Sequence, residues 1–153
     1  AIRTAVEQLA RCCGEPLCAE GDEVFLFPTP EQLCGLTEAQ LTGCGLGYRT
    51  RYIQHAAAQA AARTLDLDAL AGLPDDALFS RLLTLDGVGK KVANCVCLFG
   101  YGRTAMAPID VWIQRLIDEE FGGRDPFPAY GQQAGIVQQY LFYYKRSIST
   151  QKK

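Results

Sequence analysis

The sequence predicts an all-α protein, and two observations carry that prediction. Apolar residues recur at helical spacing through most of the chain, whereas strand signals are almost absent. The one strand-like segment, Glu23–Phe27, is followed by Pro28 and Pro30, which confine it to a short extended loop. We therefore expect helices without a substantial sheet.

The helices of the first part of the chain are bounded by turn and capping residues. Gly14 to Pro16 ends the first of them, and Thr29 before Pro30 has the cap-then-proline order of a helix start. An alanine-rich run predicts the longest helix of this part. The expected helices cover residues 1–13, a short segment from Thr29, 37–43 and 48–64.

Turn and capping residues also bound the helices of the second part of the chain. Pro74 precedes two acidic residues, as at a helix N-terminus, and Gly122–Gly123 ends a later helix. Residues 147–153 are polar and are expected to be a frayed tail, so the folded helical region is placed at 1–146. The expected helices cover 67–72, 75–84, 90–101, 108–121 and 130–146.

The composition fits a globular chain and restricts its partners. With 153 residues, 48% apolar and 21% charged, the chain suits one domain or two small helical lobes that share a core. No apolar run approaches the roughly 20 residues of a membrane span, so no membrane partner is expected. The net charge of -2 means that a nucleic-acid binder would need its cations on one face. Candidates are Arg49 with Arg51, Lys90 with Lys91, Arg103, and Lys145 with Arg146.

The seven cysteines predict free thiols rather than a disulfide framework. Their number is odd and no signal peptide precedes them, which favours a reducing intracellular compartment such as the cytoplasm, nucleoid or nucleus. No C-x2-C pair occurs and His55 is the single histidine, so no metal site built from side chains is expected. The cysteines are Cys12, Cys13, Cys18, Cys34, Cys44, Cys95 and Cys97.

A glycine turn between two apolar helices is the most informative stretch, and it predicts a helix-hairpin-helix over about residues 75–101. In Leu85-Asp86-Gly87-Val88-Gly89-Lys90-Lys91, both glycines permit positive φ and close backbone approach. The N–H groups of Gly87, Val88 and Gly89 would then point at one phosphate, with Lys90 beside it. The alternative is an ordinary tight connection between two helices.

Lys91 and Asp110 are the candidate chemical groups. A lysine just inside the second helix of the hairpin lies beside the bound phosphate and is able to act as a nucleophile, although it could equally be a second phosphate clamp. Asp110 follows Pro108 at the start of another helix, where a carboxylate caps the helix. An ionised carboxylate there would also stabilise an oxocarbenium-like transition state.

These segments resemble the 8-oxoguanine DNA glycosylases of the helix-hairpin-helix (HhH-GPD) superfamily. The active-site segment, Leu85–Cys95 followed by Ala107–Val111, is similar to theirs. Three further segments agree in the same order, so that the resemblance covers nearly the whole chain. They are Val6 through Gly14, Gly45–Tyr52, which is similar to a G-L-G-Y-R-x-R-Y element, and Ala134–Phe142.

The resemblance implies a role for each matching residue. Lys91 would be the Schiff-base nucleophile and Asp110 the carboxylate that supports glycosidic cleavage. Cys95 and Phe142 would sandwich a flipped base while Gln138 hydrogen-bonds its Watson–Crick edge. In the duplex, Tyr48 would act as a wedge and Arg49 would reach the base left unpaired. The resemblance also implies a monovalent ion on the hairpin carbonyls of Leu83, Leu85 and Val88.

The chain also departs from the family pattern. Trp112 stands where histidine is frequent, and Asp86 replaces the usual proline of the turn. The β-rich N-terminal domain of the family is missing, as are the asparagines that fill the void in the opposite strand. We interpret the chain as the helical portion of such an enzyme, with weakened activity expected from it alone.

The functional hypothesis is therefore a bifunctional DNA N-glycosylase and AP lyase that removes 8-oxoguanine from duplex DNA in base excision repair. A monomer without cofactors is expected, and because the last cysteine is Cys97, the iron–sulfur cluster of some relatives is not expected. Two alternatives stay open, namely a glycosylase for another damaged purine and a non-catalytic DNA-binding module. The pair Lys91 and Asp110 favours an enzyme, since binding alone does not need it.

Overall fold

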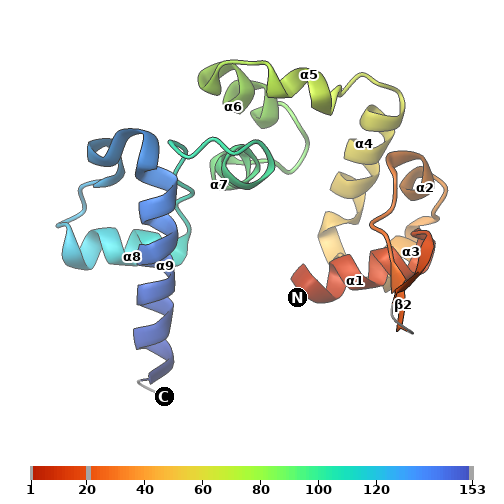
Figure 1. Cartoon of the computed structure of the whole chain (residues 1–153), viewed down its shortest axis with the longest axis horizontal. Helices are drawn as coiled ribbons and strands as arrows, with labels where there is room; N and C mark the ends of the chain where they lie inside the picture. Colours follow the sequence, from red (N-terminus) through yellow and green to blue (C-terminus); the bar gives the residue numbers. More distant parts are fainter. Residues whose placement is uncertain (1, 20–21, 152–153) are drawn as a thin grey trace. The chain divides into compact units, whose positions relative to one another are not determined.

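The computed structural model describes residues 2–19 and 22–151, and it divides the chain into two compact units. The first unit covers Ala1–Leu70 and the second Ala71–Lys153. In Figure 1 the first unit is coloured from red to yellow and the second from green to blue. Both units are built mainly from short helices, which confirms the predicted fold class.

The described part of the first unit contains the helices α1 to α4, most of α5 and a small β-hairpin. Two capping boxes explain where its short helices begin, because Thr29 and Thr37 each accept a backbone N–H while the glutamine three residues later bonds back to the threonine N–H. A 3₁₀ turn precedes the long helix, which therefore starts later than predicted. The elements are α1 (Ile2–Cys13), β1 (Pro16–Ala19), β2 (Asp22–Phe25), α2 (Pro30–Cys34), α3 (Glu38–Gly43), the 3₁₀ turn Gly47–Arg49 and α4 (Thr50–Ala61).

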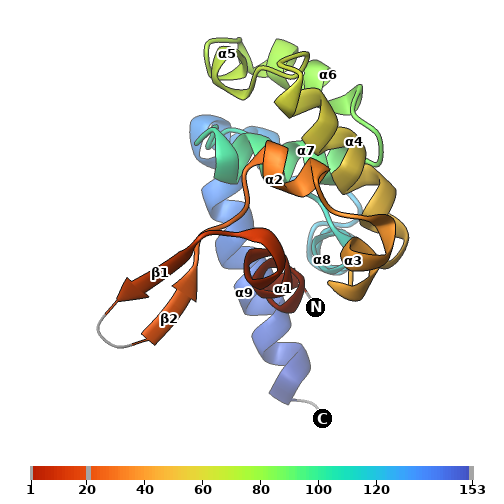
Figure 2. The same cartoon turned by 90° about the vertical axis from the view of Figure 1, so that its right-hand side faces the viewer.

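The β-hairpin formed by β1 and β2 corrects the prediction of a lone extended loop near residues 23–27. Strands β1 and β2 pair antiparallel with Pro16 opposite Phe25, and Figure 2 shows them projecting beside α1. The sequence of β1 hides this strand because proline, alanine and cysteine carry little strand preference. Pro16 is tolerated since it is the first residue of its strand, and the amide of Leu26 extends the pairing to the carbonyl of Glu15.

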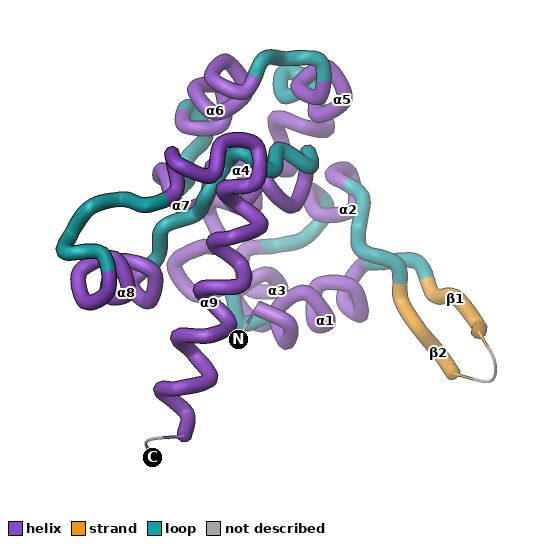
Figure 3. The backbone as a smooth tube through the Cα atoms, turned by 60° about the vertical axis from the view of Figure 1, so that its left-hand side comes forward, coloured by secondary structure: helices purple, strands orange, loops and turns teal. Residues whose placement is uncertain are grey.

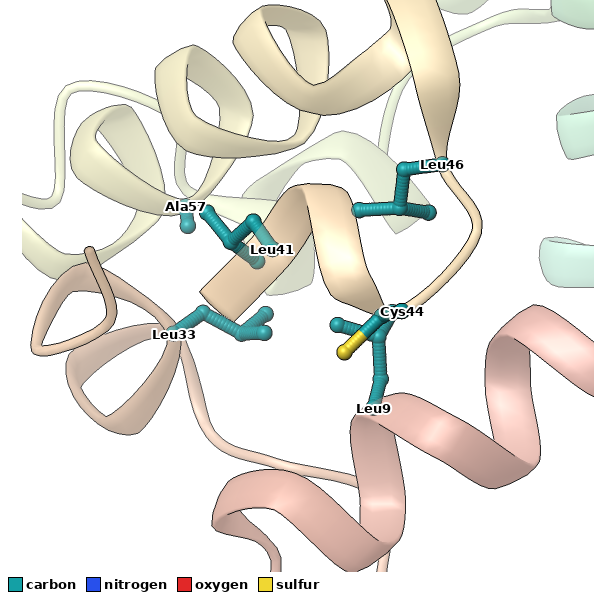
Figure 4. Close-up of a cluster of buried hydrophobic side chains, with 6 residues drawn as sticks. All are labelled: Leu9, Leu33, Leu41, Cys44, Leu46 and Ala57. Carbon is teal, nitrogen blue, oxygen red and sulfur yellow. The ribbon is translucent and has the colours of Figure 1, made fainter. Parts of the chain in front are cut away.

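The core of the first unit lies between α1, α2, α3 and α4. Leu41 is fully buried at its centre, and Figure 4 shows the other side chains converging around it. The following loop contributes to the same cluster, so the turn after α3 is anchored in the core. The buried members are Leu9, Leu33, Leu41, Cys44, Leu46 and Ala57.

The second unit contains the helix-hairpin-helix motif and two longer helices that pack against one another. Helix α5 (Leu67–Ala71) crosses the boundary between the units, and the helix-hairpin-helix motif follows it. The helices α8 and α9 lie side by side (Figures 1 and 3). The elements are α6 (Asp75–Leu83), α7 (Lys90–Cys95) with a π-helical turn over Val96–Gly100, α8 (Val111–Glu120), the 3₁₀ segment Phe127–Gln133 and α9 (Ala134–Gln151).

Helix α9 extends into the segment 147–153, which was predicted to be a frayed tail. The helix continues to Gln151, and residues 152–153 lie outside the described part of the chain. No proline or glycine interrupts the segment after Arg146, and the Ser147 hydroxyl donates to the carbonyl of Tyr143 at 2.9 Å. An ion pair between Lys145 and Glu119 also joins α9 to α8. A polar composition was therefore a poor guide, because polar residues are tolerated on an exposed helical face.

None of the described helices combines the length and the apolar character needed to cross a bilayer.

Arg103 holds the start of the helix-hairpin-helix motif in place. Its guanidinium donates to the carbonyls of Ala71 at 2.7 Å and Leu73 at 3.1 Å, and it forms an ion pair with Asp75 at 3.5 Å. These contacts satisfy carbonyls just after α5 and fix the chain as α6 begins. Arg103 therefore has a structural role, in addition to its place among the candidate cations.

Gly135 brings the start of α9 into close contact with the loop after the π-helical turn. Its amide donates to the carbonyl of Thr104 at 2.7 Å. A Cβ atom at this position would lie 2.4 Å from the carbonyl oxygen of Met106 and 2.8 Å from Cδ1 of Leu98. Since one of these atoms is backbone, the first turn of α9 reaches its position only with glycine at 135.

We expect Gly135→Ala to destabilise the protein by about 1–3 kcal/mol, because the new methyl group has no space without a backbone shift. Gly43→Ala, in α3, is the matched control, since its Cβ would meet nothing within 4 Å. Alanine there should be neutral or stabilise by about 0.5–1 kcal/mol. Urea unfolding of both variants measures the difference, and equal midpoints would contradict this account.

Candidate active site

The hairpin turn presents backbone amides without a side-chain cap. Gly87 has φ +76°, as predicted, and the amide of Val88 donates to the carbonyl of Leu85 at 3.1 Å. Gly89 is the N-cap of α7 with φ −92°, so of the two glycines that permit a positive φ, Gly87 adopts one and Gly89 does not. No side chain caps α7 at this end, which leaves its first N–H groups available to an anion.

A cavity of about 120 Å³ in the second unit brings the predicted base-pocket and catalytic residues together. Its wall comes from α7 and the π-helical turn, from the segment before α8, and from the first turns of α9. The lining residues are Lys91, Cys95, Phe99, Pro108, Asp110, Gln138, Gln139 and Phe142.

Lys91 and Asp110 also border a second, more open hollow. This groove of about 440 Å³ is lined by both residues together with Ile109, Val111 and Gln114. The pair therefore borders both the small cavity and the more open groove. Within the described part of the chain, the Lys91 amine has no ion-pair partner, so it is available to a ligand.

Asp110 is the N-cap of α8. Its Oδ1 accepts the amides of Trp112 and Ile113, both at 3.0 Å. The helix begins at Val111, three residues later than the prediction from Pro108, because the side chain of Asp110 completes the first turn. Both bonds use the same oxygen, so Oδ2 keeps its acceptor positions for a ligand. Asp110 and the buried Pro108 both line the cavity.

Gln138 is a buried amide in the cavity wall. Only 3% of its surface is exposed, although polar side chains are seldom so buried without a partner. Its Oε1 accepts a hydrogen bond from Nε2 of the neighbouring Gln139, which also lines the cavity. This bond orients the Gln138 amide and leaves its own N–H groups for a ligand.

The aromatic wall of the cavity has one predicted and one unpredicted member. Phe142 is half-buried, and the guanidinium of Arg146 lies 5.6 Å from its ring centroid. Phe99 was missed by the sequence analysis although 63% of its surface is exposed. Its spacing of four residues after Cys95 was the available signal, because such residues share a helical face. Pro108 and Gln139 were likewise not predicted.

Tyr48 and Arg49 belong to the first unit and form an exposed aromatic–cationic turn. Gly45 and Gly47 both have positive φ, so the chain turns sharply before these residues. Tyr48 is 71% exposed, and the Arg49 guanidinium lies 4.5 Å above its ring. A large exposed aromatic ring stacked with a cation is suited to contact with nucleobases.

The candidate cations differ in availability. The side chain of Lys145 is 13% exposed and pairs with Glu119, so it does not belong to a DNA-binding face, contrary to its place among the candidates. Lys90 is exposed at the first position of α7 and borders the hairpin turn. Among the residues that the structure describes, no group of three or more His, Cys, Asp or Glu side chains is placed to hold a metal ion.

Comparison with known proteins identifies the family. The profile of the HhH-GPD superfamily of base excision DNA repair proteins matches residues 1–130. A probable N-glycosylase/DNA lyase of Methanothermobacter thermautotrophicus is 31% identical over 170 aligned residues, which cover 93% of this chain and 54% of that protein. The chain belongs to the HhH-GPD superfamily.

Two solved structures share the fold closely. MBOgg1 in complex with a low-affinity DNA ligand has a TM-score of 0.89 at 32% identity. The Clostridium acetobutylicum 8-oxoguanine glycosylase/lyase, bound to dsDNA with cytosine opposite 8-oxoG, has a TM-score of 0.89 at 27% identity. Each match covers 97% of this chain and 54% of the other. The chain thus spans about half the length of these relatives.

We expect Asp110→Asn and Asp110→Ala to separate the two uses of this residue. Asparagine caps a helix about as well as aspartate, so Asp110→Asn should keep the melting temperature. Asp110→Ala should lose about 0.5–2 kcal/mol of stability with the cap. Thermal unfolding followed by circular dichroism measures both, and equal destabilisation by the two substitutions would show that the cap does not stabilise α8.

Proposed function

We propose that the protein is a DNA N-glycosylase with AP lyase activity that removes 8-oxoguanine from duplex DNA. The observation that carries the proposal is the gathering of an amine, a carboxylate, an amide and an aromatic ring around one small cavity. The amine can form the imine of the lyase step, the carboxylate can support glycosidic cleavage, and the amide and the ring can bind a flipped base. The 8-oxoguanine glycosylases among the similar structures support this choice of substrate.

The two hollows fit the two parts of a flipped nucleotide. The base would enter the small cavity between Cys95 and Phe142, and the sugar would lie at its mouth, beside Lys91 and Asp110. The duplex backbone would then follow the open groove that the same pair borders. In this arrangement the amine and the carboxylate meet C1′ of the sugar, where the bond breaks.

The reaction then follows from the properties of these groups. As the glycosidic bond breaks, the purine leaves with the bonding electrons, and Asp110 stabilises the positive charge that develops on the sugar. The Lys91 amine forms a bond to C1′, and ring opening with loss of a proton gives an imine. The imine acidifies the C2′ hydrogen, so β-elimination expels the 3′ phosphate and cuts the strand.

The pocket residues would select the base. Gln138 would hydrogen-bond the Watson–Crick edge, and its orientation by Gln139 fixes which atoms it offers. Phe142 would stack on one face of the base, with Arg146 holding the outer side of its ring. The thiol of Cys95 would contact the opposite face.

Duplex DNA is the proposed partner, bound by a monomer. The hairpin amides of Gly87, Val88 and Gly89, together with Lys90, would hold one phosphate, while Tyr48 and Arg49 would act at the flipped-out position. Such a repair protein would work where chromosomal DNA lies, in the nucleoid or nucleus. No cofactor and no iron–sulfur cluster is required by the reaction.

A monovalent ion on the carbonyls of Leu83, Leu85 and Val88 also fits the hairpin. Carbonyl oxygens are the ligands that hard cations prefer. The Leu85 carbonyl accepts the Val88 amide with one lone pair and keeps the other. The ion would strengthen the positive end of the hairpin toward a phosphate.

Two alternatives differ from this proposal in measurable ways. A glycosylase for another damaged purine would use the same Lys91 and Asp110 but prefer a different base in excision assays. A non-catalytic helix-hairpin-helix module would bind duplex DNA without forming a covalent adduct.

Borohydride trapping tests the proposed chemistry. On a duplex with an abasic site, the protein should give a covalent adduct through reduction of the imine. Lys91→Gln should abolish the adduct and keep DNA binding, because only the amine is lost. Lys90→Gln is the matched control at the neighbouring position and should keep the adduct while weakening binding in a salt-dependent manner. Trapping that depends on Lys90 and not on Lys91 would reverse the assignment.

The base pocket has its own test. Gln138→Ala should cost on the order of 1–3 kcal/mol of transition-state stabilisation, since polar atoms of the base would remain unpaired. Phe142→Ala should lose a similar amount with the stacking surface. Single-turnover excision of 8-oxoguanine measures both, with affinity for undamaged duplex as the control. Unchanged excision in both variants would place the pocket elsewhere.

A further inference from the structure

The second unit contains another cavity, which the proposed reaction does not use. We call it the Asn94 cavity, and the cavity that contains Lys91 and Gln138 the catalytic cavity. The Asn94 cavity has a volume of about 230 Å³, against about 120 Å³ for the catalytic cavity. Its wall comes from α7, from the loop before α8 and from the 3₁₀ segment that leads into α9. Most of this wall is apolar, with contributions from Ala105, Met106, Ala107, Phe127 and Pro128.

The two cavities are neighbours, because the same elements line both. On α7, Asn94 lines one cavity and the next residue, Cys95, lines the other. On α9, Ala134 of the Asn94 cavity lies one helical turn before Gln138 of the catalytic cavity. A small molecule that leaves the catalytic cavity therefore has only a short distance to travel to the Asn94 cavity.

Two polar side chains of the Asn94 cavity keep hydrogen-bonding atoms for a ligand. Within the part of the chain that the structure describes, no residue hydrogen-bonds the half-buried side-chain amide of Asn94. Asp125 accepts the amide of Phe127 with Oδ1 at 2.9 Å, which leaves Oδ2 as an acceptor. No lysine or arginine is among the described residues that line the cavity. The cavity therefore favours a ligand that presents N–H groups to a carboxylate.

These groups match the Watson–Crick edge of a guanine-type base. On that edge, N1–H and the exocyclic amine form a pair of parallel N–H donors, like those with which a guanidinium binds a carboxylate. The carbonyl O6 beside them is an acceptor, which suits the N–H donors of the Asn94 amide. The flat apolar faces of a purine suit the apolar wall, since small-molecule sites combine such a wall with a few polar groups.

We propose that the Asn94 cavity binds the purine base that the glycosylase step releases, an inference that rests on the proposed function. 8-Oxoguanine keeps the Watson–Crick edge of guanine, so N1–H and the amine would donate to Asp125 while Asn94 donates to O6. The transfer makes and breaks no covalent bond. It would clear the catalytic cavity and keep the base away from C1′ while Lys91 forms the imine.

Equilibrium dialysis of the protein against free purine bases tests the proposal. Guanine and 8-oxoguanine should bind alike, because they share the edge that Asp125 accepts. Hypoxanthine lacks only the exocyclic amine of guanine and should bind about tenfold more weakly, since one hydrogen bond to a charged group is lost. Binding should persist in Phe142→Ala, which removes the stacking surface of the catalytic cavity alone. Equal affinity for guanine and hypoxanthine would overturn the proposal, as would loss of binding in a folded Phe142→Ala.

Two substitutions should remove the site by different means. In Asp125→Asn, the new side-chain oxygen can still accept the amide of Phe127, while its N–H groups oppose those of the base. Affinity for guanine should fall about ten- to a hundredfold. Ala105→Leu should weaken binding as well, because it fills part of the cavity and leaves both polar side chains in place. Wild-type affinity in both variants would overturn the proposal.

Asp76→Asn is the matched control. It removes the same charge from an exposed position in the first turn of α6, outside the Asn94 cavity, so it should bind guanine like the wild type. A loss of affinity as large as that of Asp125→Asn would show that the effect comes from overall charge, which would overturn the role of Asp125.

Borohydride trapping on an abasic duplex separates this inference from the proposed function. The abasic substrate carries no base, so Asp125→Asn and Ala105→Leu should both give the wild-type amount of adduct. Failure of the wild-type chain to form the adduct would overturn the proposed function and, with it, the release of a base. Normal trapping by a chain that binds no free guanine would overturn only the assignment of the Asn94 cavity.

Discussion

The close approach of Gly135 to the loop after the π-helical turn is the constraint on which the cavity depends. This residue lies against the backbone of Met106 and the side chain of Leu98, and it bonds to Thr104. The first turn of α9 is thereby held against both the π-helical turn and the segment that leads to α8. Gln138 lies one helical turn after Gly135 and Phe142 two, so their positions opposite Cys95 follow from this contact.

The cavity is stabilised by hydrophobic packing beneath it rather than by its own polar groups. Ile113 and Ile117 of α8 are buried with Phe127 and Ala134 on the side of α9. Burying a polar side chain such as Gln138 costs free energy unless its atoms are paired. The bond from Gln139 offsets only part of that cost. A ligand able to pair with the remaining N–H groups would offset the rest, which is the expected condition of a binding site.

The sequence was informative where a local interaction decides the structure. Both capping boxes, the proline before α6 and the glycine turn depend on neighbouring residues, and these elements lie close to their predicted places. Strand β1 and the end of α9 were missed because distant partners decide them, namely β2 for the first and Glu119 for the second. The π-helical turn over Val96–Gly100 has no local signature either.

The residues of the candidate site likewise divide into those that could be predicted from the sequence and those that could not. Lys91 and Asp110 could be predicted because each lies in a short segment with its own local signal, the glycine turn for the first and the proline-initiated helix start for the second. Gln139 and Phe99 needed the folded structure to show that they line the same cavity. The backbone conformation of Gly89 could not be predicted from the sequence for a related reason. Glycine permits a positive φ without requiring it, and the cap of α7 takes an extended backbone there.

Asp110 ties the chemistry of the site to the folding of α8. The oxygen that caps the helix fixes the carboxylate, so the second oxygen needs no further ordering before it meets a developing positive charge. Lys91 lines the same groove and has no ion-pair partner among the described residues. A direct ion pair between the two would have stabilised the empty site and opposed attack by the amine. Because the Asp110 carboxylate is bonded to backbone amides instead, the Lys91 amine remains available. The formation of α8 supplies the free energy that orders the Asp110 side chain.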